Sequence, residues 1–186
     1  MRLPALQRRE QLLDAATTLI AERGYWGLSL QDVADACGIT LPGVLHHFGS
    51  KDGLLVAVLE HRDRLDTAAL VEHLEAGAPP DLAGVCDAIV SRNAGQREIV
   101  RLYAVLEVES LAPDHPAHAF FAERQRRTLA LLTRWAPAAR SGDALARHIL
   151  ALMDGLQIQW LRDPELDLVA EWRAVSGQLP ALRRPL

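Results

Sequence analysis

The sequence predicts an all-α protein built from nine helical segments. Helix-forming residues dominate the composition, and runs of β-branched residues are absent. Apolar residues recur at spacings of three and four in one segment after another, as they do on the buried side of a helix. Glycine and proline residues divide these segments. Hydrophobic residues make up 49% of the chain and aromatic residues 5%, so we expect a large core made mostly of Leu, Val and Ala.

The first predicted helix covers residues 5–23, and Gly24 ends it. Its apolar side is formed by Leu6, Leu13, Ala16, Leu19 and Ile20. Tyr25 and Trp26 follow the glycine, and we expect both side chains to pack beneath the next two helices.

Residues 30–48 predict two short helices joined by a tight turn. The small residue Ala34 lets the helices approach at a steep angle, and Gly38 can take the left-handed conformation that closes the turn. Val44 then fills the angle between the helices. This spacing is typical of a helix-turn-helix, whose second helix has a free outer face that can enter a DNA major groove. It also fits any two-helix corner of an all-α protein, so the flanking residues decide between the two interpretations.

Capping residues flank both short helices. Ser29 is a good N-cap for the first helix, and Asp32 in its first turn favours the positive helix end. Thr40 is a second N-cap, and Pro42 is tolerated in the first turn that follows it. Gly49 then stops the second short helix.

A long helix is predicted over residues 51–76, with Ser50 as its cap. At 1.5 Å per residue its length is about 39 Å, enough to tie a small N-terminal module to a second layer. We therefore predict a helix-turn-helix domain at residues 1–50 and a second, larger helical domain at residues 51–186. The later helices of the second domain are predicted at 81–93, 96–112, 117–135, 142–161 and 165–179.

The composition limits the function. The net charge is −4, so binding to nucleic acid would depend on a local basic patch rather than on the overall field. Cys37 and Cys86 have neither a metal-ligand spacing nor the number needed for a disulfide framework, and both are expected to be small buried hydrophobes. We find no signal peptide and no apolar run long enough to cross a membrane, which predicts a cytoplasmic protein.

No metal site or catalytic site is predicted. His46 and His47 diverge by about 100° on a helix, so they cannot easily share one ion. His115 and His118 are better spaced, but they have no cysteine nearby and a proline between them. An all-α enzyme would need a nucleophile–base pair, a metal cluster or a phosphate-binding glycine loop, and we find none of these. We therefore expect no enzyme activity and no cofactor.

Two stretches resemble the TetR family of transcriptional regulators. The stronger is SLQDVADACGITLPGVLHHFGSKDGLL at residues 29–55, and the looser is ALMDGLQIQWLRDPELDL at residues 151–168. The resemblance implies a nine-helix fold, a homodimer, and a repressor that a small molecule releases from its operator in double-stranded DNA. It makes residues 1–50 the helix-turn-helix DNA-binding domain and residues 51–186 the ligand-binding and dimerisation domain.

The resemblance also implies which residues contact DNA. These are Ser29, Gln31, Thr40, Leu41, Pro42, Gly43, Leu45, His46, His47 and Lys51. Many members carry a basic residue at position 41 and a tyrosine at 45, whereas Leu41 and Leu45 can supply only apolar contacts, for example to thymine methyl groups. His46 and His47 must then make more of the polar contacts.

Basic residues near the recognition helix are expected to bind the DNA backbone. Lys51 lies at a helix N-terminus, where backbone N–H groups already favour a phosphate. Arg2, Arg8 and Arg9 could act as an arm that reaches the backbone or the minor groove, or they could form a solvated helix face.

The ligand site is expected among the middle helices, as an apolar cavity for a partly apolar effector. Its candidate residues are Cys86, Ile89, Tyr103, Leu106, Glu107, Phe121, Met153, Gln157 and Trp160. These residues could instead fill the core. Glu107 and Gln157 stand out because an inward polar side chain on an apolar helix needs a partner.

The last two helices are apolar on more than one side, which predicts a four-helix dimer interface. The candidate contacts are Leu145, His148, Leu152, Leu156 and Trp172. These side chains could instead cover helices of their own subunit. A helical small-molecule-binding or adaptor protein without DNA binding remains the alternative function.

Overall fold

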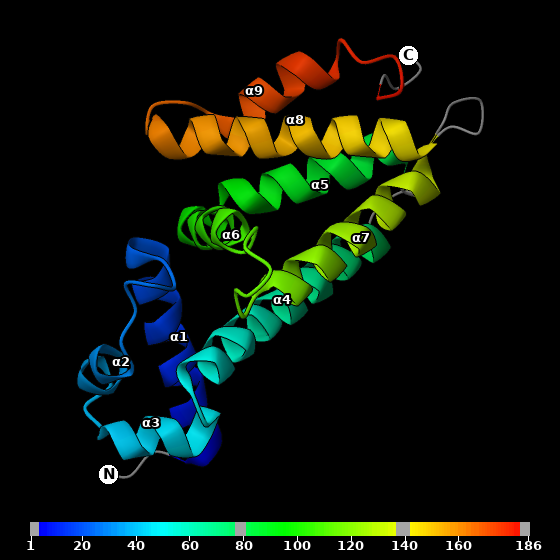
Figure 1. Ribbon diagram of the computed structural model, residues 1–186. Coiled ribbons are helices and arrows are strands. Elements are labelled where there is room, and N and C mark those ends of the chain that lie inside the picture. Colours follow the sequence, from blue (N-terminus) through cyan, green and yellow to red (C-terminus); the bar gives the residue numbers. More distant parts are fainter. Residues whose placement is uncertain (1–3, 77–80, 137–141, 183–186) are drawn as a thin grey trace. The chain divides into compact units, whose positions relative to one another are not determined.

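The computed structural model describes residues 4–76, 81–136 and 142–182, and the described residues form nine α-helices and no strand (Figure 1). The all-α prediction is confirmed. The helices are α1 (Ala5–Arg23), α2 (Leu30–Ala36), α3 (Leu41–Phe48), α4 (Lys51–Ala76), α5 (Leu82–Ala94), α6 (Arg97–Glu109), α7 (His118–Trp135), α8 (Gly142–Arg162) and α9 (Leu168–Ser176). No helix in these ranges is both long and apolar enough to cross a membrane.

Polar caps explain where several helices begin. Ser29 accepts hydrogen bonds from two backbone N–H groups of α2, and Asp167 does the same for α9. Thr40 precedes α3 with an extended backbone, but its side chain makes no capping bond. The α9 helix begins at Leu168, later than the predicted residue 165, because Asp167 is its cap.

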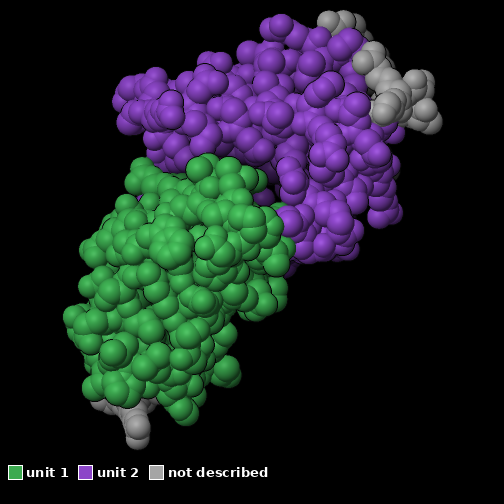
Figure 2. Space-filling view, viewed as in Figure 1, with its two compact units in different colours: residues 1–66, 101–121 green, residues 67–100, 122–186 purple. Residues whose placement is uncertain are grey.

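The chain divides into two compact units (Figure 2). The first consists of Met1–Asp66 and Arg101–Phe121, and the second of Thr67–Val100 and Ala122–Leu186. The first unit contains all of residues 1–50, the predicted DNA-binding domain, and adds the beginning of α4 and most of α6.

The core of the first unit includes aliphatic side chains of α1, α2, α3 and α4. Leu12, Leu13, Ala16, Ile20, Val33, Ala34, Val44, Leu54, Leu55 and Val58 are all 0% exposed. Tyr25 is buried, but Trp26 is 66% exposed, so the prediction that both aromatic residues pack beneath the helix-turn-helix is wrong for Trp26. Leu6 is also exposed, because it lies almost two turns before Leu12, where the buried part of α1 begins.

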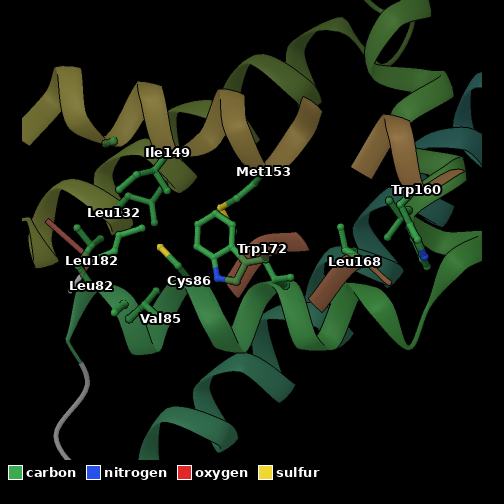
Figure 3. Packing of buried hydrophobic residues seen from close by; sticks show 14 residues of the cluster. Leu82, Val85, Cys86, Leu132, Ile149, Met153, Trp160, Leu168, Trp172 and Leu182 are labelled. Carbon is green, nitrogen blue, oxygen red and sulfur yellow. The ribbon is translucent and has the colours of Figure 1, made fainter. Parts of the chain in front are cut away.

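The core of the second unit surrounds Trp172 of α9 (Figure 3). Cys86 of α5 and Met153 of α8 belong to the same buried cluster, and Figure 3 shows the Trp172 indole between them. The indole Nε1 donates a 2.8 Å hydrogen bond to Asp87. Trp172 is 1% exposed, so in this structure its side chain packs in the core of its own unit, and its predicted role at a dimer interface stays a prediction.

Candidate DNA-binding site

The α2 and α3 helices and the turn between them form a helix-turn-helix. Gly38 adopts φ +62°, and the N–H of Ile39 donates a 3.0 Å hydrogen bond to the carbonyl of Ala34. Ala34 and Val44 are completely buried where the two helices meet. The small, glycine and aliphatic positions therefore have the structural roles predicted from their spacing.

The predicted DNA contacts all lie in the first unit. Ser29 is exposed at the α2 N-terminus, where it accepts from the N–H groups of Gln31 (3.1 Å) and Asp32 (3.2 Å). On α3, Leu45 is 39% exposed and His46 is exposed, whereas the preceding Val44 is buried. The helix therefore presents an apolar and imidazole surface. Thr40 and Pro42 are exposed, and Leu41, Gly43, His47 and Lys51 are partly exposed.

His47 differs electrostatically from an ordinary exposed histidine. Burial lowers its pKa, and the nearby His46, Arg9 and Arg8 lower it further. The lowered pKa favours the neutral imidazole of His47, which can both donate and accept a hydrogen bond.

Two of the three predicted arm residues brace the helix-turn-helix. Arg8 donates to the carbonyl of Cys37 at 3.2 Å, and the guanidinium of Arg9 lies 5.2 Å from the centre of the Phe48 ring. Both side chains thus connect α1 to α2 or α3 and are not extended away from the protein. Arg2 lies outside the described residues.

Lys51 is held against an aromatic ring. Its ammonium lies 4.4 Å from the centre of the Tyr25 ring, within the range of a cation–π interaction. The Tyr25 hydroxyl donates to Asp52, and burial together with this carboxylate raises the tyrosine pKa. Sequence reasoning missed Tyr25 as a partner of Lys51; its position directly after Gly24 was the only available signal.

Comparison with known proteins identifies the family. Residues 12–58 match the family model for bacterial regulatory proteins of the tetR family. The HTH-type transcriptional regulator BetI of Burkholderia thailandensis is 32% identical over 162 residues, which cover 83% of this chain and 80% of that protein. The chain belongs to the TetR family.

Two further proteins are similar to this chain, one in sequence and one in fold. The HTH-type transcriptional repressor KstR2 of Rhodococcus jostii is 31% identical over 123 residues, covering 66% of this chain but only 52% of that protein, so the chain spans about half of its length. A transcriptional regulator from Saccharomonospora viridis, solved in complex with choline, has a TM-score of 0.77 at 23% identity and covers 96% of this chain and 100% of that chain. That likeness shows the shared fold.

The predicted ligand residues of this TetR-family protein are divided between the two units. In the first unit Tyr103 and Phe121 are buried, with ring centres 5.9 Å apart in an edge contact, while Leu106 is buried and Glu107 is partly exposed. In the second unit Cys86, Met153 and Trp160 belong to the buried cluster around Trp172, and Ile89 packs against it.

Gln157 has the partner that its inward position requires. Its Oε1 accepts a 2.9 Å hydrogen bond from Asn93 of α5, and its Nε2 donates to the Met153 carbonyl at 3.0 Å. A hydrogen-bonded amide pair thus joins α5 to α8 beside the apolar core.

The described residues of the second unit line cavities at two places, and the lining at these places includes no predicted ligand residue. The larger, of about 410 Å³, lies between α4 and α5. It is lined by Ala69, Leu70, His73, Ala88, Ser91, Arg92, Gly95 and Gln96. The other, of about 350 Å³, lies between α5 and the α9 region and includes Asp87, Trp172 and Arg173.

Part of α8 faces solvent. His148 and Ile158 are exposed, and a Cβ added at Gly155 would meet nothing within 4 Å. The predicted contacts Leu145, Leu152 and Leu156 are partly buried against the core of their own unit.

Two histidine pairs were considered as metal ligands in the sequence, His46 with His47 and His115 with His118. The structure shows what holds the second pair: His115 Nδ1 accepts the N–H of Ala117 at 3.1 Å, and His118 Nδ1 is 2.8 Å from the Ser110 carbonyl. Within the described ranges, no three His, Cys, Asp or Glu residues are grouped so that they could hold a metal ion.

Proposed function

We propose that this protein is a ligand-responsive transcriptional repressor that binds a palindromic operator as a homodimer in the cytoplasm. The observation that carries the proposal is the helix-turn-helix whose α3 helix buries Val44 and exposes Leu45 and His46. Such a helix can enter the major groove while the capped N-terminus of α2 approaches the backbone.

We propose that base readout depends on apolar and imidazole contacts. Leu41 and Leu45 would contact thymine methyl groups, and His46 and neutral His47 would hydrogen-bond to base edges or phosphates. Ser29, Gln31, Thr40, Pro42, Gly43 and Lys51 complete the proposed DNA surface. Lys51 supplies the positive charge for a phosphate.

The proposed homodimer uses the solvent-facing side of α8. Open space at Gly155 beside the exposed Ile158 would let the same helix of a second subunit approach closely. His148 and the outer edges of Leu145, Leu152 and Leu156 would flank this contact. Ile158→Asp should shift the mass measured by light scattering from dimer to monomer, and an unchanged dimer would contradict the proposed face.

For the effector, the cavity between α4 and α5 is the best supported location. Its small and apolar lining residues, Ala69, Leu70 and Ala88, would contact an apolar body, and Ser91 and Arg92 would contact a polar end. The KstR2 relative is named as a repressor and the similar structure contains choline, which supports regulation by a small molecule. Release of DNA requires that the effector binds the DNA-free conformation more tightly.

The predicted ligand residues of the second unit define a competing location for the effector; these are Cys86, Ile89, Met153, Gln157 and Trp160. Filling the cavity with Ala88→Phe should abolish release of DNA by the effector if the cavity is the site, whereas Gln157→Leu should leave release intact. The opposite pattern would assign the effector to the residues predicted from the sequence.

DNA binding is tested with a palindrome upstream of the protein's own gene, by fluorescence anisotropy. Wild-type protein should bind specifically, and Lys51→Ala with His47→Ala should weaken binding strongly. Arg64→Ala, which removes an exposed positive charge from α4, is the matched control. Absence of specific binding by the wild type, or full binding by the double variant, would refute the proposal and favour the adaptor alternative.

A further inference from the structure

Lys51 is oriented by a ring that is itself fixed from three directions. Tyr25 is 5% exposed, and its hydroxyl donates to Asp52 at the start of α4. Its backbone N–H donates a 2.9 Å hydrogen bond to Oε2 of Glu109, the last residue of α6. The His115 and Tyr25 rings make a T-shaped contact, with ring centres 5.0 Å apart. These contacts all lie within the first unit.

The Glu109 carboxylate also covers the bend that leads into Tyr25. Gly24 adopts φ +69°, and a Cβ added there would lie 2.4 Å from Glu109 Oε1. One carboxylate oxygen therefore packs on Gly24 while the other accepts the next N–H. Both contacts fix the backbone that carries the Tyr25 ring.

His115 limits where the Glu109 carboxylate can lie. The His115 side chain is 0% exposed, and its Nε2 lies 3.9 Å from Glu109 Oε2. Because Nδ1 accepts the N–H of Ala117, a neutral His115 carries its proton on Nε2, on the side of Glu109. The imidazole therefore presents a positive N–H dipole to the carboxylate.

We propose that Glu109 is a positioning residue for the DNA contact of Lys51. It holds the Gly24–Tyr25 backbone, the Tyr25 ring then holds the Lys51 ammonium, and Lys51 meets the phosphate in a preset orientation. The inference rests on the proposed function for the role of Lys51 on DNA. The contacts of Tyr25 with Glu109 and with Lys51 do not depend on that role.

The sequence offers a direct probe, because Lys51 is the only lysine. Reductive ¹³C-methylation of the full chain labels only Lys51 and the α-amino group, and dimethylation keeps the lysine charge. The lysine signal is identified by its absence from the Lys51→Gln variant, in which only the α-amino group is labelled. Wild-type Lys51 methyl groups should be shifted upfield by the Tyr25 ring current, and Tyr25→Leu should remove that shift.

The decisive variant is Glu109→Ala, in which the Lys51 methyl signal should move most of the way to its position in Tyr25→Leu. Glu109→Gln retains an acceptor oxygen and should keep most of the upfield shift. If Glu109→Ala does not fold, Glu109→Asp, whose carboxylate is one methylene too short to make both contacts, should give a partial loss. A wild-type signal position in a folded Glu109→Ala or Glu109→Asp variant would overturn the proposal.

Operator binding gives the second measurement. Glu22→Ala is the matched control, because it removes an exposed glutamate from the end of α1. Loss of an acidic charge should leave DNA affinity unchanged or raise it, whereas Glu109→Ala should lower affinity and reduce the salt slope by about 0.9 for each lost phosphate contact. Glu109→Ala should add little to Lys51→Gln in the double variant.

These outcomes separate two failures. If the wild type binds no operator while the Lys51 signal still responds to Glu109→Ala, the positioning contact stands and the proposed function fails. If the wild type binds and the double variant is weakened additively, Glu109 does not act through Lys51, and the inference fails.

Discussion

Replacing Val44 by alanine should loosen the helix-turn-helix more than any exposed substitution in the same unit. Val44 is 0% exposed at the junction of α2 and α3, and the change removes two buried methyl groups. At about 0.8 kcal/mol for each, the transfer cost is roughly 1.6 kcal/mol. The cavity left behind raises the expected loss of unfolding free energy to about 2–3 kcal/mol.

Val108 provides a matched control for this change. It lies in the same compact unit but is 65% exposed, so Val108→Ala should change stability by less than about 0.5 kcal/mol. Urea unfolding followed by circular dichroism measures both variants. Hydrogen exchange of the α2 and α3 amides adds local resolution, since the two units can unfold in separate steps. Equal losses for the two variants, or a loss below about 0.5 kcal/mol for Val44→Ala, would refute the packing argument.

Three further predictions follow from caps and titrating groups. Ser29→Ala removes the acceptor of two N–H groups and should lower the free energy of unfolding, measured in urea, by about 1 kcal/mol. Ser29→Asp should restore most of this stability. An alanine variant as stable as the wild type would contradict the capping role. Burial raises the pKa of Cys86 to about 12, so its thiol should resist a disulfide reagent at pH 8 until urea is added, and rapid labelling of the native protein would disprove this. The pKa of His47 is lowered in the fold, so the unfolded chain binds the extra proton first and stability should fall as the pH drops through the unfolded pKa. Unfolding between pH 7 and pH 5 should show a smaller fall for His47→Gln than for the wild type, and parallel curves would refute the assignment.

Local signals were sufficient to predict most of the helices. The predicted bounds 5–23 and 51–76 agree with α1 and α4, because Gly24 and the Gly49–Ser50 pair end or begin a helix through their own backbone or side-chain chemistry. The helix-turn-helix was predictable for the same reason, since Ala34, Gly38 and Val44 act within one short segment.

Contacts between distant segments could not be predicted in this way. The hydrogen bond from Tyr25 to Glu109 joins residues 84 positions apart, and no local pattern indicates it. The exposure of Trp26 was not predictable from the local pattern either. The connection between α1 and α2 directs Tyr25 inward and leaves Trp26 outside. Periodicity likewise could not distinguish Trp172 as a core residue from Trp172 as a subunit contact, since both require an apolar helix face.

The packing of Glu109 on Gly24 has a consequence for building hybrid regulators. A graft of residues 1–50 onto the body of another regulator would carry Gly24 and Tyr25 but leave their carboxylate behind. A larger residue at position 24 would displace the end of the Glu109 side chain, since a Cβ would approach Oε1 to 2.4 Å, and it would also strain a backbone with φ +69°. A hybrid that takes its DNA-binding domain from this protein therefore needs both residues 1–50 and the end of α6, and positions 24 and 109 should be exchanged together.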